Sequence, residues 1–288
     1  MWNFMIVIFR DSTSILFVAL GILIMQLGGV INIGAEGMML MGAFFGVLGT
    51  YLTGYTGIGI LASLIILAIF GLLFGLMTVY WKGNQVVVGV ALNLLAEGMT
   101  TTLSRQAFGT GSQSSIQGFK PVFSGISVMT FVALALVFAL YFFLYHTNLG
   151  LRIRAAGEYP IAVDIAGIDV YRVQLTAVLL GSMIIGLGGC SLSMAHMNSF
   201  SELMTGGRGY IALAAVALGQ YKPAGVLLAS LMFGASNALQ YNLQASITKF
   251  PAPIIRIIPY VVTIITVIIS GRNSKDPAAL GKKYVKFS

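Results

Sequence analysis

Long apolar runs with almost no charge constrain this chain more than any other feature of its sequence. A helix needs about 20 largely apolar residues to cross a lipid bilayer. Only 8% of the 288 residues are charged, whereas soluble globular proteins carry about 25%. The chain is therefore predicted to be an all-α, polytopic integral membrane protein. The clearest candidate spans are Ser14–Ile31, Ile58–Tyr80, Val128–His146, Val173–Met197 and Ile254–Ser270.

Shorter or interrupted apolar segments bring the expected number of transmembrane helices to about eight or nine. These segments are Gly37–Thr53, Gln85–Thr102, Gly209–Gln220 and Ala224–Tyr241. The 35 glycines are spread through the runs rather than gathered in linkers, and small residues let membrane helices approach closely. We therefore expect a single transmembrane domain over residues 1–288.

The distribution of Lys and Arg predicts the orientation in the membrane. With nine crossings and an inner C-terminus, ten of the sixteen cations fall on one side, at Lys82, Lys222, Arg152–Arg172 and the tail 271–288. Cations are enriched in cytoplasmic loops, so the C-terminus is predicted in the cytoplasm and the N-terminus outside. The net charge of +8 forms no basic patch interleaved with aromatics, which argues against nucleic-acid binding and favours contact with anionic lipid.

An acidic residue interrupts the apolar sequence in "GGVINIGAEGMMLMGAFFG", residues 28–46. A charge at the bilayer centre costs about 2.5–3.5 kcal/mol on insertion scales. One interpretation is a discontinuous helix beside a transport path, with Asn32 and Glu36 near the break. The other is a turn between two spans, with Glu36 at the positive end of the second helix. The sequence does not decide between them.

Polar residues also occur within the apolar segment "KGNQVVVGVALNLLAEGMTTTLSRQAF". Asn84 is placed to cap the start of a helix. Asn93 and Glu97 lie one helical turn apart on one face of it, where they either look into a cavity or form interhelical hydrogen bonds.

The segment "MNSFSELMTGGRGY" precedes a predicted half-helix. A broken helix whose N-terminus lies inside the membrane can meet polar solute, so Asn198 and Glu202 are candidates for a transport pathway. The alternative is that Glu202 and Arg208, which flank the start of the half-helix, form a surface ion pair of little energetic value.

The segment 147–173, "TNLGLRIRAAGEYPIAVDIAGIDVYRV", contains the only long polar loop predicted to be cytoplasmic. A short amphipathic helix is expected near Pro160–Ala166, because proline suits the first position of a helix. The Gly167 that follows suits a helix end. This surface element is a candidate docking site for another protein, or an ordinary loop that rests on the membrane.

Signals of catalysis or metal binding are missing from the sequence. Cys190 is the only cysteine, which excludes an intrachain disulfide, and His146 and His196 lack partners at ligand spacing. Neither a nucleophile motif nor a "GxxxxGK[ST]" phosphate loop occurs. The chain is therefore expected not to be an enzyme and to bind no cofactor of its own.

The polar loop resembles the coupling loop of permease subunits from ATP-binding cassette (ABC) importers. In that pattern, alanine, a variable residue, glycine and glutamate precede a short helix that closes on Ala-Gly-Ile, as in "RAAGEYPIAVDIAGIDVYR", residues 154–172. The resemblance implies contact with an ABC ATPase, which uses ATP and Mg²⁺. The coupling residues it implies are Arg154, Gly157, Glu158, Ala162, Ala166, Gly167 and Ile168.

Two further segments support this resemblance. Residues 32–37 read Asn-Ile-Gly followed by a Glu-Gly pair, which resembles the nucleoside-importing branch of the ribose and branched-chain amino-acid permease family. "GRGYIALAAVALGQYKPAGVLLASLMFG" resembles a half-helix, a short cytoplasmic turn and another span. Compared with the ribose permeases, the chain begins near the second span.

The resemblance implies a permease subunit in a bacterial plasma membrane that imports nucleosides, with purine nucleosides such as guanosine favoured. The implied partners are a second, often non-identical permease subunit, the ATPase and a substrate-binding lipoprotein. A simple-sugar or branched-chain amino-acid permease is the first alternative, and a proton-coupled secondary transporter that uses Glu36 or Glu97 is the second. The candidate pathway residues are Asn32, Glu36, Asn93, Glu97, Asn198 and Glu202.

Overall fold

The computed structural model describes residues 2–109, 111–113, 118–119, 121–123, 125–246, 257, 259, 261–262, 264–265, 268 and 276–285. Helices make up nearly all of this part of the chain, as predicted. The helices are α1 (Trp2–Leu27), α2 (Ala35–Thr53), α3 (Thr56–Gly75), α4 (Gln85–Phe108), α5 (Val128–His146), α6 (Asn148–Glu158), α7 (Pro160–Ile165), α8 (Val170–Cys190), α9 (Arg208–Leu218) and α10 (Pro223–Ser246).

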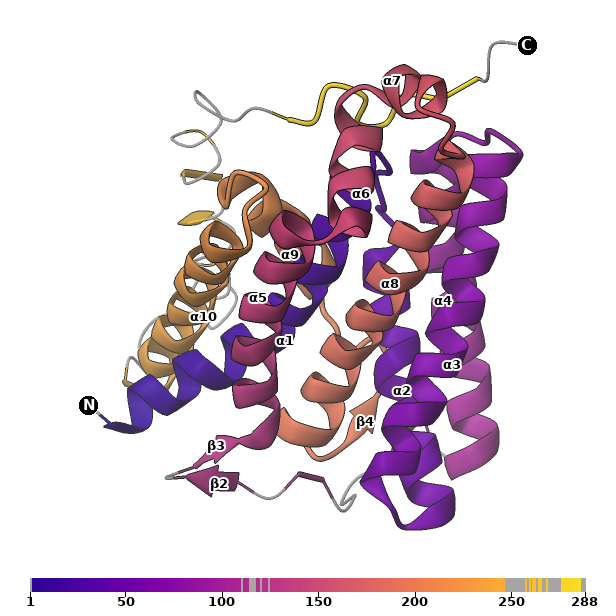
Figure 1. Ribbon diagram of the computed structural model, residues 1–288. Coiled ribbons are helices and arrows are strands. Elements are labelled where there is room, and N and C mark those ends of the chain that lie inside the picture. Colours follow the sequence, from indigo (N-terminus) through magenta and orange to yellow (C-terminus); the bar gives the residue numbers. More distant parts are fainter. Residues whose placement is uncertain are drawn as a thin grey trace.

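Short π-helical and extended segments complete the fold. The π-helices η1 (Leu76–Tyr80) and η2 (Ser191–His196) extend α3 and α8. Two antiparallel pairs form among the strands β1 (Ser112–Gln113), β2 (Pro121–Phe123), β3 (Ile126–Ser127) and β4 (Phe200–Ser201), with β1 against β4 and β2 against β3. In Figure 1, α6 and α7 lie at one end of the helical bundle, while β2, β3 and β4 lie at the other end.

Six helices in the described part of the chain are long and apolar enough to cross a membrane. They are Phe4–Leu27, Ala35–Thr53, Thr56–Tyr80, Gln85–Phe108, Val128–His146 and Val170–His196. The first of these differs from the predicted span Ser14–Ile31, because helix α1 starts earlier and ends at Leu27. Most of the predicted span Ile254–Ser270 lies outside the described residues.

The predicted segment Gly209–Gln220 forms only a half-length helix. Helix α9 has 11 residues, which corresponds to about 16 Å. The hydrocarbon core of a bilayer is about 30 Å thick, so α9 reaches through about half of it. The next predicted segment, Ala224–Tyr241, lies within the longer helix α10.

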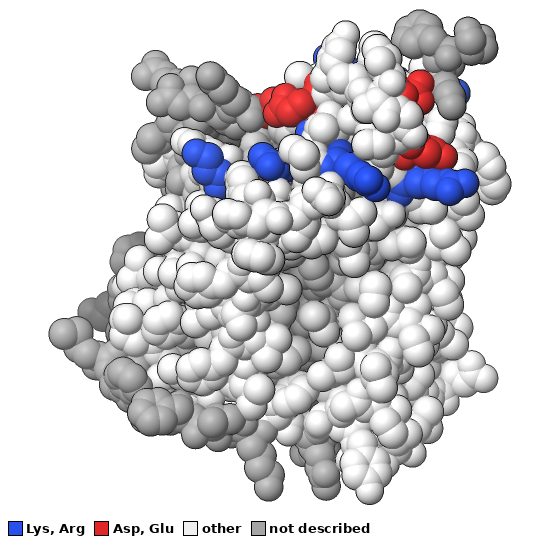
Figure 2. Space-filling view, in the orientation of Figure 1, with Lys and Arg blue, Asp and Glu red and all other residues white. Residues whose placement is uncertain are grey.

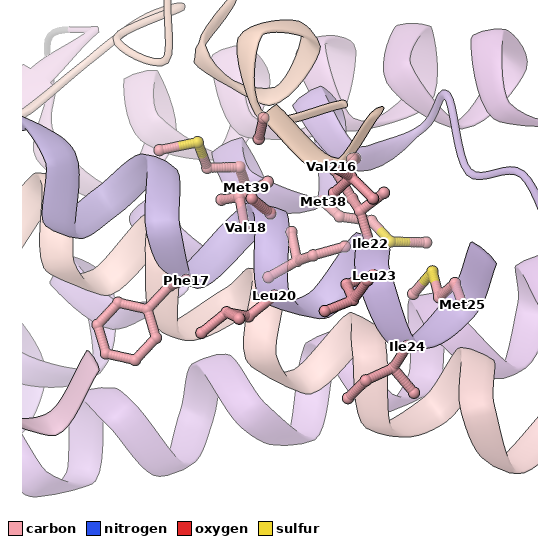
Figure 3. Close-up of a cluster of buried hydrophobic side chains, with 14 of the residues drawn as sticks. Phe17, Val18, Leu20, Ile22, Leu23, Ile24, Met25, Met38, Met39 and Val216 are labelled. Carbon is pink, nitrogen blue, oxygen red and sulfur yellow. The ribbon is translucent and has the colours of Figure 1, made fainter. Parts of the chain in front are cut away.

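Helix α1 forms the centre of the core. Nearly every residue from Ile15 to Met25 is buried, and a helix that is apolar all round belongs in the interior. Figure 3 shows these side chains against Met38 and Met39 of α2 and Val216 of α9. Glycines allow close packing here, since a Cβ at Gly21 of α1 would lie 2.5 Å from the carbonyl oxygen of Gly181 in α8. This is the close helix approach that small residues permit in membranes.

The outer surface has an apolar zone and a charged edge. Helices α3, α4 and α5 expose large apolar side chains such as Ile65, Leu94 and Phe138, an arrangement suited to lipid rather than to water. Figure 2 shows Lys and Arg side chains in a row near the end that carries α6 and α7, with an uncharged surface below the row. The charges therefore gather at one end of the bundle on this face.

Polar side chains at helix starts behave as the sequence predicts. Asn84 Oδ1 accepts hydrogen bonds from the N–H groups of Val86 (3.0 Å) and Val87 (3.3 Å) at the start of α4, which confirms the predicted cap. Pro160 occupies the first turn of α7. Gly167 follows that helix with a φ of +77°, a left-handed conformation that favours glycine.

The segment expected to be a polar loop is more helical than predicted. It contains α6 and α7 and the start of α8, rather than one short helix in a loop. Local capping explains the extra helix, since Thr147 Oγ1 accepts a hydrogen bond from Gly150 N–H (3.1 Å) at the start of α6. Arg154 then holds α6 to α5 by donating from Nε to the carbonyl oxygen of Leu144 (3.0 Å).

Candidate functional site

The connection between α1 and α2 reverses the chain inside the bundle. Gly29 takes a φ of +86°, and Val30 N–H donates to the carbonyl oxygen of Met25 (3.0 Å). Side chains from other helices satisfy further backbone groups of this connection. Ile31 N–H donates to Gln85 Oε1 (2.7 Å), and Gln174 Nε2 donates to the carbonyl oxygen of Gly28 (3.1 Å).

These two glutamines explain how an irregular backbone is tolerated inside the helical bundle. Backbone polar groups away from water require partners, and a broken helix in a membrane is stable where surrounding protein supplies them. Gln85 comes from α4 and Gln174 from α8. Our sequence interpretation missed both residues, although a glutamine within or beside an apolar run is a usable signal.

Glu36 binds the start of the half-helix α9. Its Oε1 accepts a hydrogen bond from Gly207 N–H (2.7 Å), and its Oε2 accepts one from Gly209 N–H (2.6 Å). Glu36 also lies in the first turn of α2. The side chain is only 7% exposed, but charge-assisted hydrogen bonds and two positive helix ends offset the cost of burying it.

This arrangement combines parts of both sequence interpretations. Glu36 does begin the second helix, and it does lie beside a broken one. Its carboxylate, however, is occupied by backbone N–H groups that lie about 170 residues further along the chain. The partial positive charge at the N-terminus of α9 is therefore already balanced by the Glu36 carboxylate.

Asn93 of α4 contacts the same two helices, α2 and α9, and the connection that precedes α2. Its Oδ1 accepts a hydrogen bond from Gly37 N–H (2.8 Å), and its Nδ2 donates to the carbonyl oxygen of Ile33 (3.1 Å) and to the hydroxyl of Tyr210 (2.9 Å). Asn93 belongs to α4 and Tyr210 to α9. The interhelical hydrogen bonds that the sequence left as one alternative are thus present at Asn93.

The other two candidates from the first part of the chain differ in exposure. Asn32 is fully buried, with its Nδ2 3.3 Å from Met25 Sδ and 3.2 Å from Met38 Sδ. Within the described part of the chain, its Oδ1 has no hydrogen-bond partner. Glu97 lies one turn beyond Asn93 on α4 and is partly exposed.

The segment between η2 and α9 holds the last two candidates. Asn198 is exposed, with a φ of +48°. Glu202 accepts hydrogen bonds from Arg105 Nε (2.7 Å) and Nη2 (3.2 Å), and these bonds hold the pKa of Glu202 below its usual range. The proposed pairing with Arg208 is wrong, because Arg208 Nη1 donates instead to the carbonyl oxygens of Met204 (3.4 Å) and Thr205 (3.3 Å).

The structure therefore brings together three of the six pathway candidates. Asn32, Glu36 and Asn93 meet at the connection between α1 and α2 and the start of α9. Asp11, which our sequence interpretation missed, lies fully buried in α1 with its Oδ1 3.1 Å from His196 Nε2. An aspartate within an apolar helix was a readable signal, but the predicted span began at Ser14 and so excluded it.

The candidate coupling residues lie on α6, on α7 and directly after α7. Gly157 is buried and touches the end of α1, because a Cβ on it would overlap the carbonyl oxygen of Leu27. The more exposed residues lie on and after α7, where the added Cβ of a Gly167 variant would have no atom within 4 Å. A groove of about 460 Å³ lies between α6 and α7; among the residues that line it are Leu151, Arg152, Ala155, Ala162, Ala166 and Ile168.

Residues 276–285, which we call the C-terminal strap, cross this region. Ala279 N–H donates to the carbonyl oxygen of Gly157 (2.8 Å), and Gly281 N–H donates to that of Gly29 (3.0 Å). Ala278 N–H donates to Glu158 Oε2 (3.3 Å). The strap thus connects the end of α6 directly with the connection between α1 and α2.

Tyr284 anchors the far part of the strap. Its ring lies 5.6 Å from that of Tyr171 in α8, and Tyr171 donates from its hydroxyl to the carbonyl oxygen of Tyr284 (3.4 Å). Burial, and secondarily the neighbouring Asp164 carboxylate, raises the pKa of Tyr284 to about 12. The strap, Gln174 and residues 158–161 line an open pocket of about 450 Å³.

Among the described residues, no group of three or more His, Cys, Asp or Glu side chains is placed to hold a metal ion. Cys190 is buried, with its Sγ 3.5 Å from the carbonyl oxygen of Gly42. The geometry consists of helix ends held by polar side chains, which suits movement of helices rather than covalent chemistry.

Comparisons with known proteins agree on one class. Residues 4–267 match the model of the family described as "Branched-chain amino acid transport system / permease component". The guanosine ABC transporter permease protein NupQ of Bacillus subtilis is 31% identical, over 96% of this chain and 94% of its own. The nucleoside ABC transporter permease protein NupC of Lactococcus lactis subsp. cremoris is 32% identical over the same shares.

The name of a third relative specifies a different solute. The "Putative glucose ABC transporter permease protein TsgC13" of Haloferax volcanii is 36% identical, over 82% of this chain and 76% of its own. No solved structure matches the chain.

Proposed function

The chain belongs to the family of permease components of branched-chain amino acid transport systems, and we propose that within this family it forms the membrane pathway of an importer for nucleosides, with purine nucleosides such as guanosine favoured. As an ABC transporter permease, it is a non-catalytic, multi-pass subunit of the cell membrane and binds no cofactor. ATP is hydrolysed by a partner ATPase, and a binding protein delivers the solute. The alternative of a proton-coupled secondary transporter is therefore wrong.

The observation that carries the nucleoside proposal is the extent of the similarity. Two relatives whose names specify guanosine or nucleosides align with 96% of this chain. The relative whose name specifies glucose aligns with 82%, although its identity of 36% is higher. A sugar permease is therefore the second candidate, and both candidates share a solute with a hydroxylated ring.

We also propose that the second permease subunit is a different chain. The family includes a separate nucleoside permease, NupB, in the same Lactococcus that contains NupC, and it matches only 38% of this chain. The delivering protein is proposed to be a lipoprotein of a bacterial plasma membrane, as the resemblance implies.

We propose that the end with α6 and α7 faces the cytoplasm and receives the ATPase, and that the C-terminus lies on that side. The row of Lys and Arg near that end supports this orientation (Figure 2), because cations are enriched on the cytoplasmic side of membrane proteins. In this proposal Glu158, Ala162, Ala166, Gly167 and Ile168 form the docking surface. Arg154 and Gly157 act differently, since they hold α6 against α5 and α1.

Movement of α6 would then reach the pathway through direct contacts. Gly157 touches Leu27 at the end of α1, and the connection that follows leads to Asn93, Glu36 and the start of α9. We propose that Asn32, Glu36 and Asn93 border the pathway by holding these helix ends. Under the same proposal, Glu97, Asn198 and Glu202 line it elsewhere.

Uptake by the reconstituted complex tests the solute. The complex of this chain with its second permease, ATPase and binding lipoprotein is expected to take up labelled guanosine in an ATP-dependent manner. Labelled ribose, glucose and leucine serve as alternative solutes, and omission of ATP is the control. Uptake of any of these three without uptake of guanosine would overturn the nucleoside proposal.

A further inference from the structure

A small polar pocket lies between α9 and α10, beside the network of Glu36 and Asn93. It has a volume of about 180 Å³, and its polar lining consists of Arg208, Asn237, Gln240 and Tyr241. We call it the α9–α10 pocket. Pockets that enclose whole drug-sized ligands measure about 300–1,000 Å³, so this one has room for only part of such a molecule.

Helix α10 contributes a polar face to the pocket. Asn237, Gln240 and Tyr241 stand at positions i, i+3 and i+4, which lie together on one side of a helix. Asn237 is only 8% exposed. Polar side chains at such sites in a membrane protein usually face the bundle interior or a solute path, which favours a functional surface here.

Arg208 closes the pocket from the first residue of α9. Its Nη1 is held by the carbonyl oxygens of Met204 (3.4 Å) and Thr205 (3.3 Å). Its buried Nε has no hydrogen-bond partner in the part of the chain that the structure describes. The guanidinium is thus fixed in place with one donor unused.

Asp11 lies nearby and is also incompletely satisfied. It is 0% exposed, and neither carboxylate oxygen has a well-aligned hydrogen bond among the described residues, although Oδ1 is 3.1 Å from His196 Nε2. The charge of Arg208 acts on Asp11, and that of Asp11 acts on Tyr241. Asp11 does not line the pocket, so it acts on Arg208 and Tyr241 only through its charge.

The chemistry of these groups selects a class of ligand. Glu36 already occupies the N-terminus of α9, so that helix end offers little to an anion. The polar groups that remain in the lining are one guanidinium, two amides and a phenol. A hydroxyl both donates and accepts hydrogen bonds, so a neutral ring with neighbouring hydroxyls can use all of these groups.

We propose that the α9–α10 pocket binds the sugar hydroxyls of the solute during transport. The Tyr241 hydroxyl and the amides of Asn237 and Gln240 exchange hydrogen bonds with the sugar hydroxyls, while the Arg208 guanidinium donates to the hydroxyl oxygens. This inference rests on the proposed function, since guanosine and glucose share a hydroxylated ring. The location agrees with transporters in general, where discontinuous helices form the solute site.

The test compares two solutes that differ only in the sugar. ATP-dependent uptake of guanosine and of 2′,3′-dideoxyguanosine is measured with the whole complex, and the ratio of the two rates is recorded. The binding lipoprotein is the same in every sample, so its selectivity cancels when variant and wild type are compared. Gln240→Leu and Tyr241→Phe are expected to lower the ratio about three- to tenfold each, the effect of one neutral hydrogen bond.

Gln244→Leu is the matched control, because Gln244 lies one turn further along α10 and does not line the pocket. It is expected to leave the ratio unchanged. Tyr241→Phe removes a single hydroxyl, so it remains informative if another variant fails to assemble.

The outcomes separate this inference from the proposed function. An unchanged ratio in assembled Tyr241→Phe and Gln240→Leu complexes refutes the pocket even if guanosine is transported. If the wild type imports glucose instead of guanosine, the nucleoside proposal fails, and the same variants are compared with glucose and 3-deoxyglucose. Loss of discrimination in that pair supports the pocket, and retained discrimination refutes it.

Discussion

Replacing Glu36 with glutamine tests whether the charge of this residue holds a helix end in place or contacts the solute. In the structure, the two carboxylate oxygens accept N–H groups from Gly207 and Gly209 at 2.7 and 2.6 Å. A glutamine has the same shape but only one acceptor oxygen, and its NH₂ group faces an N–H donor. Glu36→Gln therefore removes one of these hydrogen bonds and weakens the other.

The size of the effect follows from these contacts. A hydrogen bond to a charged group contributes about 1.5–3 kcal/mol, and an anion at a helix N-terminus contributes about 0.3–1 kcal/mol more. We expect the free energy of local opening at the start of α9 to fall by about 2–3 kcal/mol. Since 1.4 kcal/mol is a factor of ten, the amides of Gly207 and Gly209 should exchange hydrogen about 30 to 150 times faster.

Hydrogen exchange of the purified complex in lipid nanodiscs measures this opening directly, because native-state exchange reports local free energies. Glu202→Gln is the control: it breaks an exposed pair with Arg105, and such pairs contribute about 0–1 kcal/mol. Exchange at α9 should not respond to it. If Glu36→Gln abolishes transport but leaves the exchange of both glycine amides unchanged, Glu36 acts on the solute and the structural explanation is refuted.

Two further predictions concern the end with α6 and α7. Gly157→Ala places a methyl group against Leu27, and overpacking of this kind costs about 1–3 kcal/mol, so we expect solute-stimulated ATP hydrolysis to fall severalfold. Gly57→Ala in α3 is the control, because its added Cβ meets no atom within 4 Å and its φ is not positive. This variant should largely retain the stimulated hydrolysis, and equal losses would contradict the role of the Gly157 contact. Tyr284→Ala should speed hydrogen exchange at Ala279 and Gly281, whereas Tyr284→Phe should not. Because burial raises the pKa of Tyr284 from 10.0 to about 12, ionisation of its hydroxyl destabilises the strap. The strap therefore keeps its full stability below pH 10 and loses stability as the pH rises towards 12, and this loss should be absent from Tyr284→Phe.

Local chemistry was readable from the sequence. The length and apolar character of the runs predict the all-helical membrane class, since a bilayer requires about 20 apolar residues per span. The cap at Asn84, the helix start at Pro160 and the helix end at Gly167 were likewise predictable. In each case the deciding contact or backbone angle involves neighbours within a few residues.

The roles of the buried polar residues were not readable in this way. The partners of Glu36, Gly207 and Gly209, lie about 170 residues away, so the sequence leaves a transport role and a structural role equally open. Gln85 and Gln174 complete a connection that neither adjoins in sequence. These assignments depend on which helix ends meet in space.

Composition and local pattern thus determined that this protein is a helical membrane protein with a short helix that begins at Pro160. Tertiary packing alone decided that Glu36 caps α9, that Arg208 lines the α9–α10 pocket, and that the C-terminal strap joins α6 to the end of α1. The physical reason is the separation along the chain between the residues that interact. Lipid selects apolar residues one segment at a time, whereas a buried polar group is stable only with partners that distant parts of the chain supply.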